Sequence, residues 1–199
     1  MRSVFINPEL CIGCLQCEID CAIEHSESKD ASLAFLELPV PRKRIHVQAG
    51  PVASTAFPNR CRHCDPAPCL LACLPGAISR NAEKNTVFID PNRCINCASC
   101  AMACPFGVIR YHEDYTAPPG KTVAVKCDNC YERQLARLIP ACVEVCKSGA
   151  LSFEEKADAM KRKTDEVART VSAGVAQVDL APGFTLLNAI KRQQIELAR

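Results

Sequence analysis

The sequence predicts an α+β protein: two interleaved modules of short hairpins and helices, followed by a helical extension at the carboxy terminus. Three observations predict this fold. Sixteen of the 199 residues are cysteine, and they fall into four groups of four. A stretch near the amino terminus recurs 83 residues later, which indicates a duplicated unit. After three of the groups, a glycine follows the last cysteine by three residues and an apolar strand start follows the glycine.

The composition is that of an ordinary globular protein apart from its cysteines. The chain is 48% apolar and 23% charged with a formal net charge of +2, which gives no sign of a nucleic-acid partner. It has 8 glycines and no tryptophan, so we expect cysteine chemistry to replace part of the core. No apolar run approaches the roughly 18 to 20 residues that span a bilayer. The amino terminus resembles no export signal, so we expect a cytoplasmic protein in which clustered cysteines bind metal.

The spacing within the groups indicates iron-sulfur chemistry. The groups are Cys11, Cys14, Cys17, Cys21; Cys61, Cys64, Cys69, Cys73; Cys94, Cys97, Cys100, Cys104; and Cys127, Cys130, Cys142, Cys146. Groups one and three have the spacing Cys-x2-Cys-x2-Cys-x3-Cys of bacterial 4Fe-4S ferredoxins, and Pro105 completes that motif in group three. Three thiolates on a tight loop can reach three irons of one cubane. We expect the fourth cysteine to open a helical turn, face away from the loop and bind a neighbouring cluster.

The internal repeat supports this interpretation. Val4–Cys14 reads Val-Phe-Ile-Asn-Pro-Glu-Leu-Cys-Ile-Gly-Cys, and Val87–Cys97 reads Val-Phe-Ile-Asp-Pro-Asn-Arg-Cys-Ile-Asn-Cys. Each copy predicts a short strand, an Asx-Pro turn and then a cysteine loop. Gly76, Gly107 and Gly149 stand at the equivalent place after groups two, three and four. A duplicated ferredoxin module explains both matches.

The length of the connections indicates which groups pair. Between groups two and three, Ile78–Ile89 is long enough for one hairpin, so these groups form a compact inner module over 61–104. Groups one and four then pair in an outer module over 1–60 and 105–153, and 154–199 forms a helical tail. Four cofactor sites follow, each taking three cysteines from one group and one from its partner. They are site 1 (Cys11, Cys14, Cys17, Cys146), site 2 (Cys61, Cys64, Cys69, Cys104), site 3 (Cys94, Cys97, Cys100, Cys73) and site 4 (Cys127, Cys130, Cys142, Cys21).

Zinc is the main alternative to a cluster at these sites. A Cys-x2-Cys pair such as Cys127 and Cys130 also suits zinc, whereas triplets at three-residue spacing fit a tetrahedral thiolate site poorly. Group four is the least regular, because 11 residues separate Cys130 from Cys142. We therefore expect four 4Fe-4S clusters, and leave open that one site holds a 3Fe-4S cluster or zinc.

Four clusters in 21.7 kDa predict an electron carrier without a substrate reaction of its own. The sequence has no G-x-G-x-x-G or P-loop motif for a nucleotide. Each oxidised cubane with four thiolates adds about two negative charges, which takes the formal charge from +2 to about −6. Arg60, Arg62 and His63 flank Cys61, where they could tune a cluster, but the favoured interpretation is a solvated loop.

The order of the cysteines over residues 1–153 resembles a known family. These are the four-cluster, ferredoxin-like electron-transfer subunits of dimethyl sulfoxide reductase, formate dehydrogenase and related complexes. The second-group spacing of that family, Cys-x2-Cys-x4-Cys-x3-Cys, is matched by Cys61–Cys73. The resemblance implies the same pairing of group one with four and of group two with three. The membrane helix that follows in some formate dehydrogenase relatives has no counterpart here.

Within that family, Cys17–Asp30 and the expected strand Arg44–Val47 resemble the electron-transfer iron-sulfur subunit of carbon monoxide dehydrogenase. That resemblance implies carbon monoxide dehydrogenase as electron donor, and a hydrogenase or a flavin-dependent oxidoreductase as acceptor. The segment Glu24–Ser26 could equally be a helix end without partner contact. Two other classes stay open: the iron-sulfur subunit of a molybdenum-dependent oxidoreductase such as formate dehydrogenase, and a non-redox module whose metals only hold a small core together.

The cysteine-free tail is predicted to be helical. Glu154–Lys163 is rich in helix formers, with acidic residues before basic ones, which suits the helix dipole. A second helix is expected over Thr185–Ala198, with an apolar face that packs on the cluster body or docks on a partner. Lys161–Lys163 is expected to be a solvated face.

Overall fold

The computed structural model describes residues 2–50 and 55–172. The chain divides into two units, Met1–Glu155 and Lys156–Arg199. All sixteen cysteines belong to the first unit. The second unit is described through its first helix.

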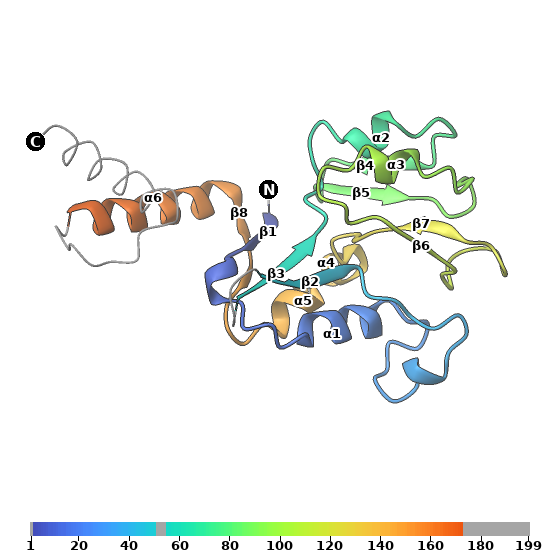
Figure 1. Cartoon of the computed structure of the whole chain (residues 1–199), viewed down its shortest axis with the longest axis horizontal. Coiled ribbons are helices and arrows are strands. Elements are labelled where there is room, and N and C mark those ends of the chain that lie inside the picture. The colour runs from blue at the N-terminus through green and yellow to red at the C-terminus, as the bar shows by residue number, and fades with distance from the viewer. Residues whose placement is uncertain (1, 51–54, 173–199) are drawn as a thin grey trace, which may run out of the picture. The chain divides into compact units, whose positions relative to one another are not determined.

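Four antiparallel two-stranded sheets form the framework of the first unit (Figure 1). They pair β1 (Arg2–Ile6) with β8 (Leu151–Glu155), β2 (Ile45–Ala49) with β3 (Ala56–Arg60), β4 (Ile78–Asn81) with β5 (Thr86–Ile89), and β6 (Arg110–His112) with β7 (Val123–Val125). Within the described residues the strands join no larger sheet. Each hairpin leads into or out of a cysteine group, which confirms a small α+β fold.

The internal repeat corresponds to a repeated strand pairing. In the first copy Ile6 of β1 pairs with Leu151 of β8, and in the second copy Ile89 of β5 pairs with Ile78 of β4. Leu151 and Ile78 each follow the last cysteine of a group by five residues. The hairpin predicted over 78–89 is therefore confirmed, and β1 with β8 forms its counterpart from opposite ends of the unit.

Short helices connect the hairpins. They are α1 (Gln16–Glu24), α2 (Pro68–Leu71), α3 (Ser99–Met102), α4 (Tyr131–Leu135) and α5 (Ala141–Glu144), with single 3-10 turns at Pro8–Leu10 and Ala34–Leu36. Helices of four or five residues are not stable alone, so packing must hold them. Helix α1 contacts α5, and α2 contacts α3 beside the β4–β5 hairpin (Figure 1).

Cysteines contribute to every part of the buried core. One group of buried residues lies between the β4–β5 and β6–β7 hairpins and includes Val87 and Val123. A second surrounds Ile45 beside the β1–β8 hairpin. The third consists of Cys61, Val108 and Cys127. The expectation that cysteine replaces part of an ordinary apolar core is confirmed.

Helix α6 (Lys156–Ser172) begins two residues later than predicted. Glu154 and Glu155 extend β8 instead, because Ser3 and Arg2 of β1 lie opposite them and complete the ladder. Lys161–Lys163 is exposed, as predicted. The helix predicted over Thr185–Ala198 lies outside the described residues. In the described part of the chain, no helix combines the length and apolar character needed to cross a membrane.

Candidate metal centres

The structure brings the sixteen thiols together in four sets. Three cavities of about 340, 350 and 310 Å³ are lined by the four cysteines of site 1, site 2 and site 3 respectively. All four cysteines of site 4 are buried. There, negative charge on Cys127, Cys142 and Cys21 acts on Cys130. Each set takes three members from one sequence group and one from another, so its geometry depends on the tertiary fold.

The backbone of the cysteine loops is arranged to bind an anion. The residue before the second cysteine has a left-handed conformation in every group: Gly13 (φ 70°), His63 (φ 49°), Asn96 (φ 57°) and Asn129 (φ 62°). Such turns direct successive N–H groups into a concave nest. The backbone N–H of His63 donates to Cys61 Sγ at 3.4 Å, and that of Asn129 donates to Cys127 Sγ at 3.3 Å. These donors favour thiolate over neutral thiol.

Helices open at the third cysteine of each group, so the prediction that the fourth cysteine opens a helical turn is wrong. Cys17, Cys69, Cys100 and Cys142 are each the second residue of α1, α2, α3 and α5. The left-handed turn before the helix ends the loop at that point in groups one and three, at Leu15 and Ala98. The fourth cysteine lies within α1 in group one and two residues beyond the helix in the other groups.

Burial makes free thiolates costly in the interior sites. Burial, with nearby negative charge, raises the pKa of Cys17 to about 12. Burial likewise raises the pKa of Cys130 and Cys142 far above the ordinary range for a thiol. Cys21 differs, because His25 and Arg44 outweigh its burial and lower its pKa. A bound metal cation stabilises thiolates that the protein interior alone disfavours, so the donor set suits metal binding.

Arg60 is buried, and the interpretation of its loop as solvated is wrong. Its side chain is 2% exposed, and Nη2 donates to Cys127 Sγ at 3.1 Å and to Asn129 Oδ1 at 3.0 Å. His63 is 4% exposed, and its Nδ1 accepts from the backbone N–H of Val87. Arg62 is half-buried over two phenylalanine rings. These side chains belong to the walls of the sites because β3 delivers them inward.

Lys126 was not considered from the sequence, although it stands directly before Cys127. It is 5% exposed, and its Nζ donates to the backbone oxygens of Val87 and Cys127. The side chain also lines the cavity of site 2. A basic residue immediately before the first cysteine of groups two and four is the signal that could have identified Arg60 and Lys126.

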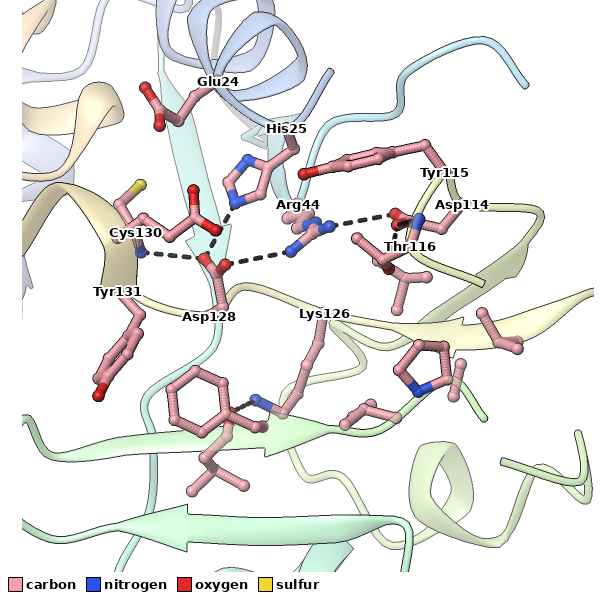
Figure 2. A pocket seen from close by; sticks show the side chains of 18 residues that line it. Glu24, His25, Arg44, Asp114, Tyr115, Thr116, Lys126, Asp128, Cys130 and Tyr131 are labelled. Atoms are coloured by element: carbon pink, nitrogen blue, oxygen red, sulfur yellow. Dashed lines mark hydrogen bonds and ion pairs between the residues drawn. The ribbon is translucent and has the colours of Figure 1, made fainter. Parts of the chain in front are cut away.

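A network of charged side chains fixes the loop of site 4 (Figure 2). Asp128 accepts hydrogen bonds from His25 Nε2 at 2.9 Å, Arg44 Nη1 at 3.3 Å and the backbone N–H of Cys130 at 2.9 Å. Arg44 also donates to Asp114 at 3.1 Å. Although burial opposes ionisation, His25 and Arg44 hold the pKa of Asp128 well below its usual value. The network ties α1, the start of β2 and the β6–β7 loop to group four.

The same network bears on the zinc alternative for group four. One ligand atom each from His25, Asp128 and Cys130 lies within 4.8 Å of the others, a spacing that a metal ion could bridge. Arg44 donates to this Asp128 carboxylate, however, and its positive charge disfavours a divalent cation there. The sulfur-only set of site 4 is the better metal centre.

Gly13 gives a prediction about site 1. With φ at +70°, alanine in its place would be strained, and the added Cβ would lie 3.3 Å from Ala56 Cβ. Gly13→Ala is expected to destabilise the iron-loaded protein by about 1–2 kcal/mol from backbone strain, with a further cost from the contact. The measurement is the urea midpoint for loss of visible absorbance. Gly107→Ala is the control, because it has similar strain at φ +57° but no atom within 4 Å of the new Cβ. Equal midpoints for both variants would contradict the expected contact.

A family model decides the broad class of the protein. The 4Fe-4S dicluster domain matches residues 52–156, a range that holds the cysteines of groups two, three and four. The chain belongs to the 4Fe-4S dicluster family. Binding of 4Fe-4S clusters follows from this membership, whereas group one lies outside the matched range.

Curated relatives cover most of the cluster-binding unit. The chain is 38% identical to the electron transport protein HydN of Escherichia coli K12 over 159 residues, covering 75% of this chain and 86% of HydN. It is 36% identical to an iron-sulfur protein of Rhodospirillum rubrum over 157 residues, 74% and 79% of the two chains. A tetrathionate reductase subunit of Salmonella typhimurium is 34% identical over 74% of this chain and 55% of its own length. A solved benzoyl-coenzyme A reductase complex gives a TM-score of 0.35 at 16% identity, covering 89% of this chain and 98% of the other, which is too low to support a conclusion.

Proposed function

We propose that this protein transfers single electrons through four 4Fe-4S clusters, bound at sites 1 to 4, between an oxidoreductase donor and an acceptor. When bound, such clusters exchange one electron with little structural rearrangement. The role of the protein is to hold the sites in series, to exclude water from the inner ones and to present the outer ones to partners. It performs no substrate reaction of its own.

The observation that carries the proposal is the linear order of the sites. Cysteines of sites 3 and 2 share one part of the core. Cys61 of site 2 packs in the same buried group as Cys127 of site 4. Cys21 of site 4 packs with Cys17 of site 1. The order 3, 2, 4, 1 follows, and it supports a path in which each site has its neighbours within packing distance.

The two ends of this series lie at the surface. Cys14 of site 1 and Cys97 of site 3 are exposed, whereas every cysteine of site 4 is buried. Ile12 and Ile95, which occupy the same position in the two repeats, are 73% and 65% exposed beside these ends. Exposed apolar side chains next to a terminal site suit a short-lived contact with a redox partner. Electrons would therefore enter at one end and leave at the other.

The buried cations support an anionic occupant at the inner sites. Within residues 2–50 and 55–172, the hydrogen bonds of the Arg60 and Lys126 side chains go to sulfur, an amide oxygen and backbone oxygens, and to no carboxylate. A buried charge without a counter-ion costs several kcal/mol. Neutral thiols cannot offset that cost, but clusters with thiolate ligands can. The residues therefore fit the proposed cofactor.

The proposal includes two interleaved ferredoxin-like modules. The inner module, 61–104, holds groups two and three around the β4–β5 hairpin, and the outer module, 1–60 with 105–153, holds groups one and four. The pairing of β1 with β8 supports this division, because it joins the start and end of the outer module as β4 joins β5 in the inner one. Cytoplasmic location is part of the same proposal.

For the donor we propose carbon monoxide dehydrogenase, with a hydrogenase or a flavin-dependent oxidoreductase as acceptor. The support is the resemblance of Cys17–Asp30 to the corresponding electron-transfer subunit. In this segment His25 and Ser26 are buried, so they have a structural role, whereas residues 27–30 are exposed and accessible to a partner. A second proposal is an iron-sulfur subunit of a molybdenum-dependent oxidoreductase, favoured by the likeness to a reductase subunit of Salmonella typhimurium.

The donor is tested by mixing the anaerobically purified protein with a catalytic amount of carbon monoxide dehydrogenase under carbon monoxide. Rapid loss of iron-sulfur absorbance that requires both proteins is the expected result. Formate dehydrogenase with formate tests the second proposal in parallel. If dithionite reduces the protein but carbon monoxide dehydrogenase does not, that donor is wrong. If dithionite causes no bleaching, the electron-transfer function itself is wrong.

A further inference from the structure

Two buried cations lie at the middle of the proposed series, and each reaches across to the neighbouring site. Arg60 directly precedes Cys61, a site 2 ligand, but its guanidinium donates to Cys127 Sγ of site 4. Lys126 directly precedes Cys127, a site 4 ligand, but its side chain lines the cavity of site 2. The two positions are equivalent in their cysteine groups, so the crossed contacts form a reciprocal pair.

We propose that Arg60 raises the reduction potential of the cluster at site 4 and that Lys126 raises that of the cluster at site 2, which makes the two inner sites the places where electrons rest. This inference rests on the proposed function, because it requires clusters at both sites. It assigns the two residues a tuning role through electrostatics. Neither residue replaces a ligand.

The physical argument begins with charge. Adding one electron to a cluster makes the site more negative by one charge, while no bond forms or breaks. A fixed positive charge nearby favours the more negative form, and hydrogen bonds to sulfur act in the same direction. Arg60 Nη2 lies 3.1 Å from Cys127 Sγ, and the backbone N–H of Asn129 donates to the same sulfur at 3.3 Å. Cys127 therefore receives two donors, one of them charged.

Burial increases the effect. Arg60 is 2% exposed and Lys126 is 5% exposed, so solvent and salt screen their charges weakly. Charge-assisted hydrogen bonds are about twice as strong as neutral ones. Burial by itself would lower the potentials of inner sites, since it disfavours added charge. The two cations oppose that effect where it is strongest, between sites 2 and 4.

The test is an EPR-monitored redox titration of the full chain, purified anaerobically, with iron and sulfide measured for every variant. Cys142→Ser and Cys69→Ser identify the signals of sites 4 and 2. Arg60→Gln is expected to weaken single-electron reduction at site 4 by about tenfold, which corresponds to about 59 mV, with a smaller change at site 2. Lys126→Gln is expected to have the reciprocal effect. Arg60→Lys, which keeps the charge, is expected to recover part of the loss.

Arg93→Gln is the matched control. Arg93 also stands directly before the first cysteine of its group, but it is exposed and its Nη2 donates to the backbone oxygen of Pro75. No site is expected to change by more than about twofold in this variant, because solvent screens the lost charge. A tenfold change in Arg93→Gln would show that any basic residue at this position acts equally.

The outcomes separate this inference from the proposed function. Unchanged potentials in Arg60→Gln and Lys126→Gln, with full iron content, would overturn the tuning role alone. So would a shift at site 2 and not at site 4 in Arg60→Gln. If Arg60→Gln loses iron, Arg60→Met fills the space without the charge and receives the same titration. If both lose site 4 iron and Arg60→Lys keeps it, Arg60 is required for cluster assembly and the tuning role is wrong. Wild-type protein without iron would instead refute the proposed function.

Discussion

Cys21→Ser is expected to remove the cluster of site 4 while leaving site 1 occupied, although Cys21 belongs to the same sequence group as the site 1 ligands. Cys21 is buried, and its negative charge acts on Cys130 and Cys142 of site 4. Loss of one thiolate ligand should lower the iron content by about four of the roughly 16 atoms that four cubanes contain. Iron analysis and EPR of the reduced protein measure the loss.

Cys17→Ser is the matched control for this prediction. Cys17 and Cys21 lie one turn apart on α1 and both are buried, so the two substitutions make similar changes to the same helix. Cys17→Ser is expected to match Cys11→Ser in its EPR spectrum, and Cys21→Ser to match Cys142→Ser. If Cys21→Ser instead matched Cys11→Ser, the pairing of group one with group four would be refuted.

Removal of iron is expected to abolish the fixed structure of Arg2–Glu155. At neutral pH the released thiols become neutral, since burial raises the pKa of Cys17 to about 12 and those of Cys130 and Cys142 still higher. Arg60 and Lys126 then lose their counter-ions, at a cost of several kcal/mol each. Domains of this size are stable by about 5–15 kcal/mol, so this loss alone uses most of that stability.

Amide hydrogen exchange of the β1–β8 and β4–β5 hairpins measures the effect. Slow exchange in the iron-loaded protein should become fast after treatment with an oxidant and a chelator. Reconstitution with iron and sulfide under reducing conditions should restore slow exchange, which controls for chemical damage. Hairpins that stay protected without iron would mean that the apolar core alone supports the fold.

Much of the local structure was predictable because it depends on short stretches of chain. The hairpin over 78–89 was expected from its length and apolar ends, and the structure pairs Ile78 with Ile89. The repeat of Val4–Cys14 in Val87–Cys97 predicted two equivalent strands, and both are present. The predicted start of the tail helix at Glu154 failed for the opposite reason. The end of β8 depends on β1, which lies about 150 residues away in the sequence.

The sequence by itself determined which residues could bind metal, since cysteine spacing is a local property that fixes how thiols can surround one cofactor. It also determined the grouping into modules, through the lengths of the connections. Only the tertiary structure decided the order of the sites, the burial of Arg60 and the reach of Lys126 into the neighbouring site. A side chain is buried or solvated according to which distant segment covers it. Neighbours in the sequence therefore suggested a solvated loop at Arg60, while β3 and the loop of group four placed its guanidinium against a thiol.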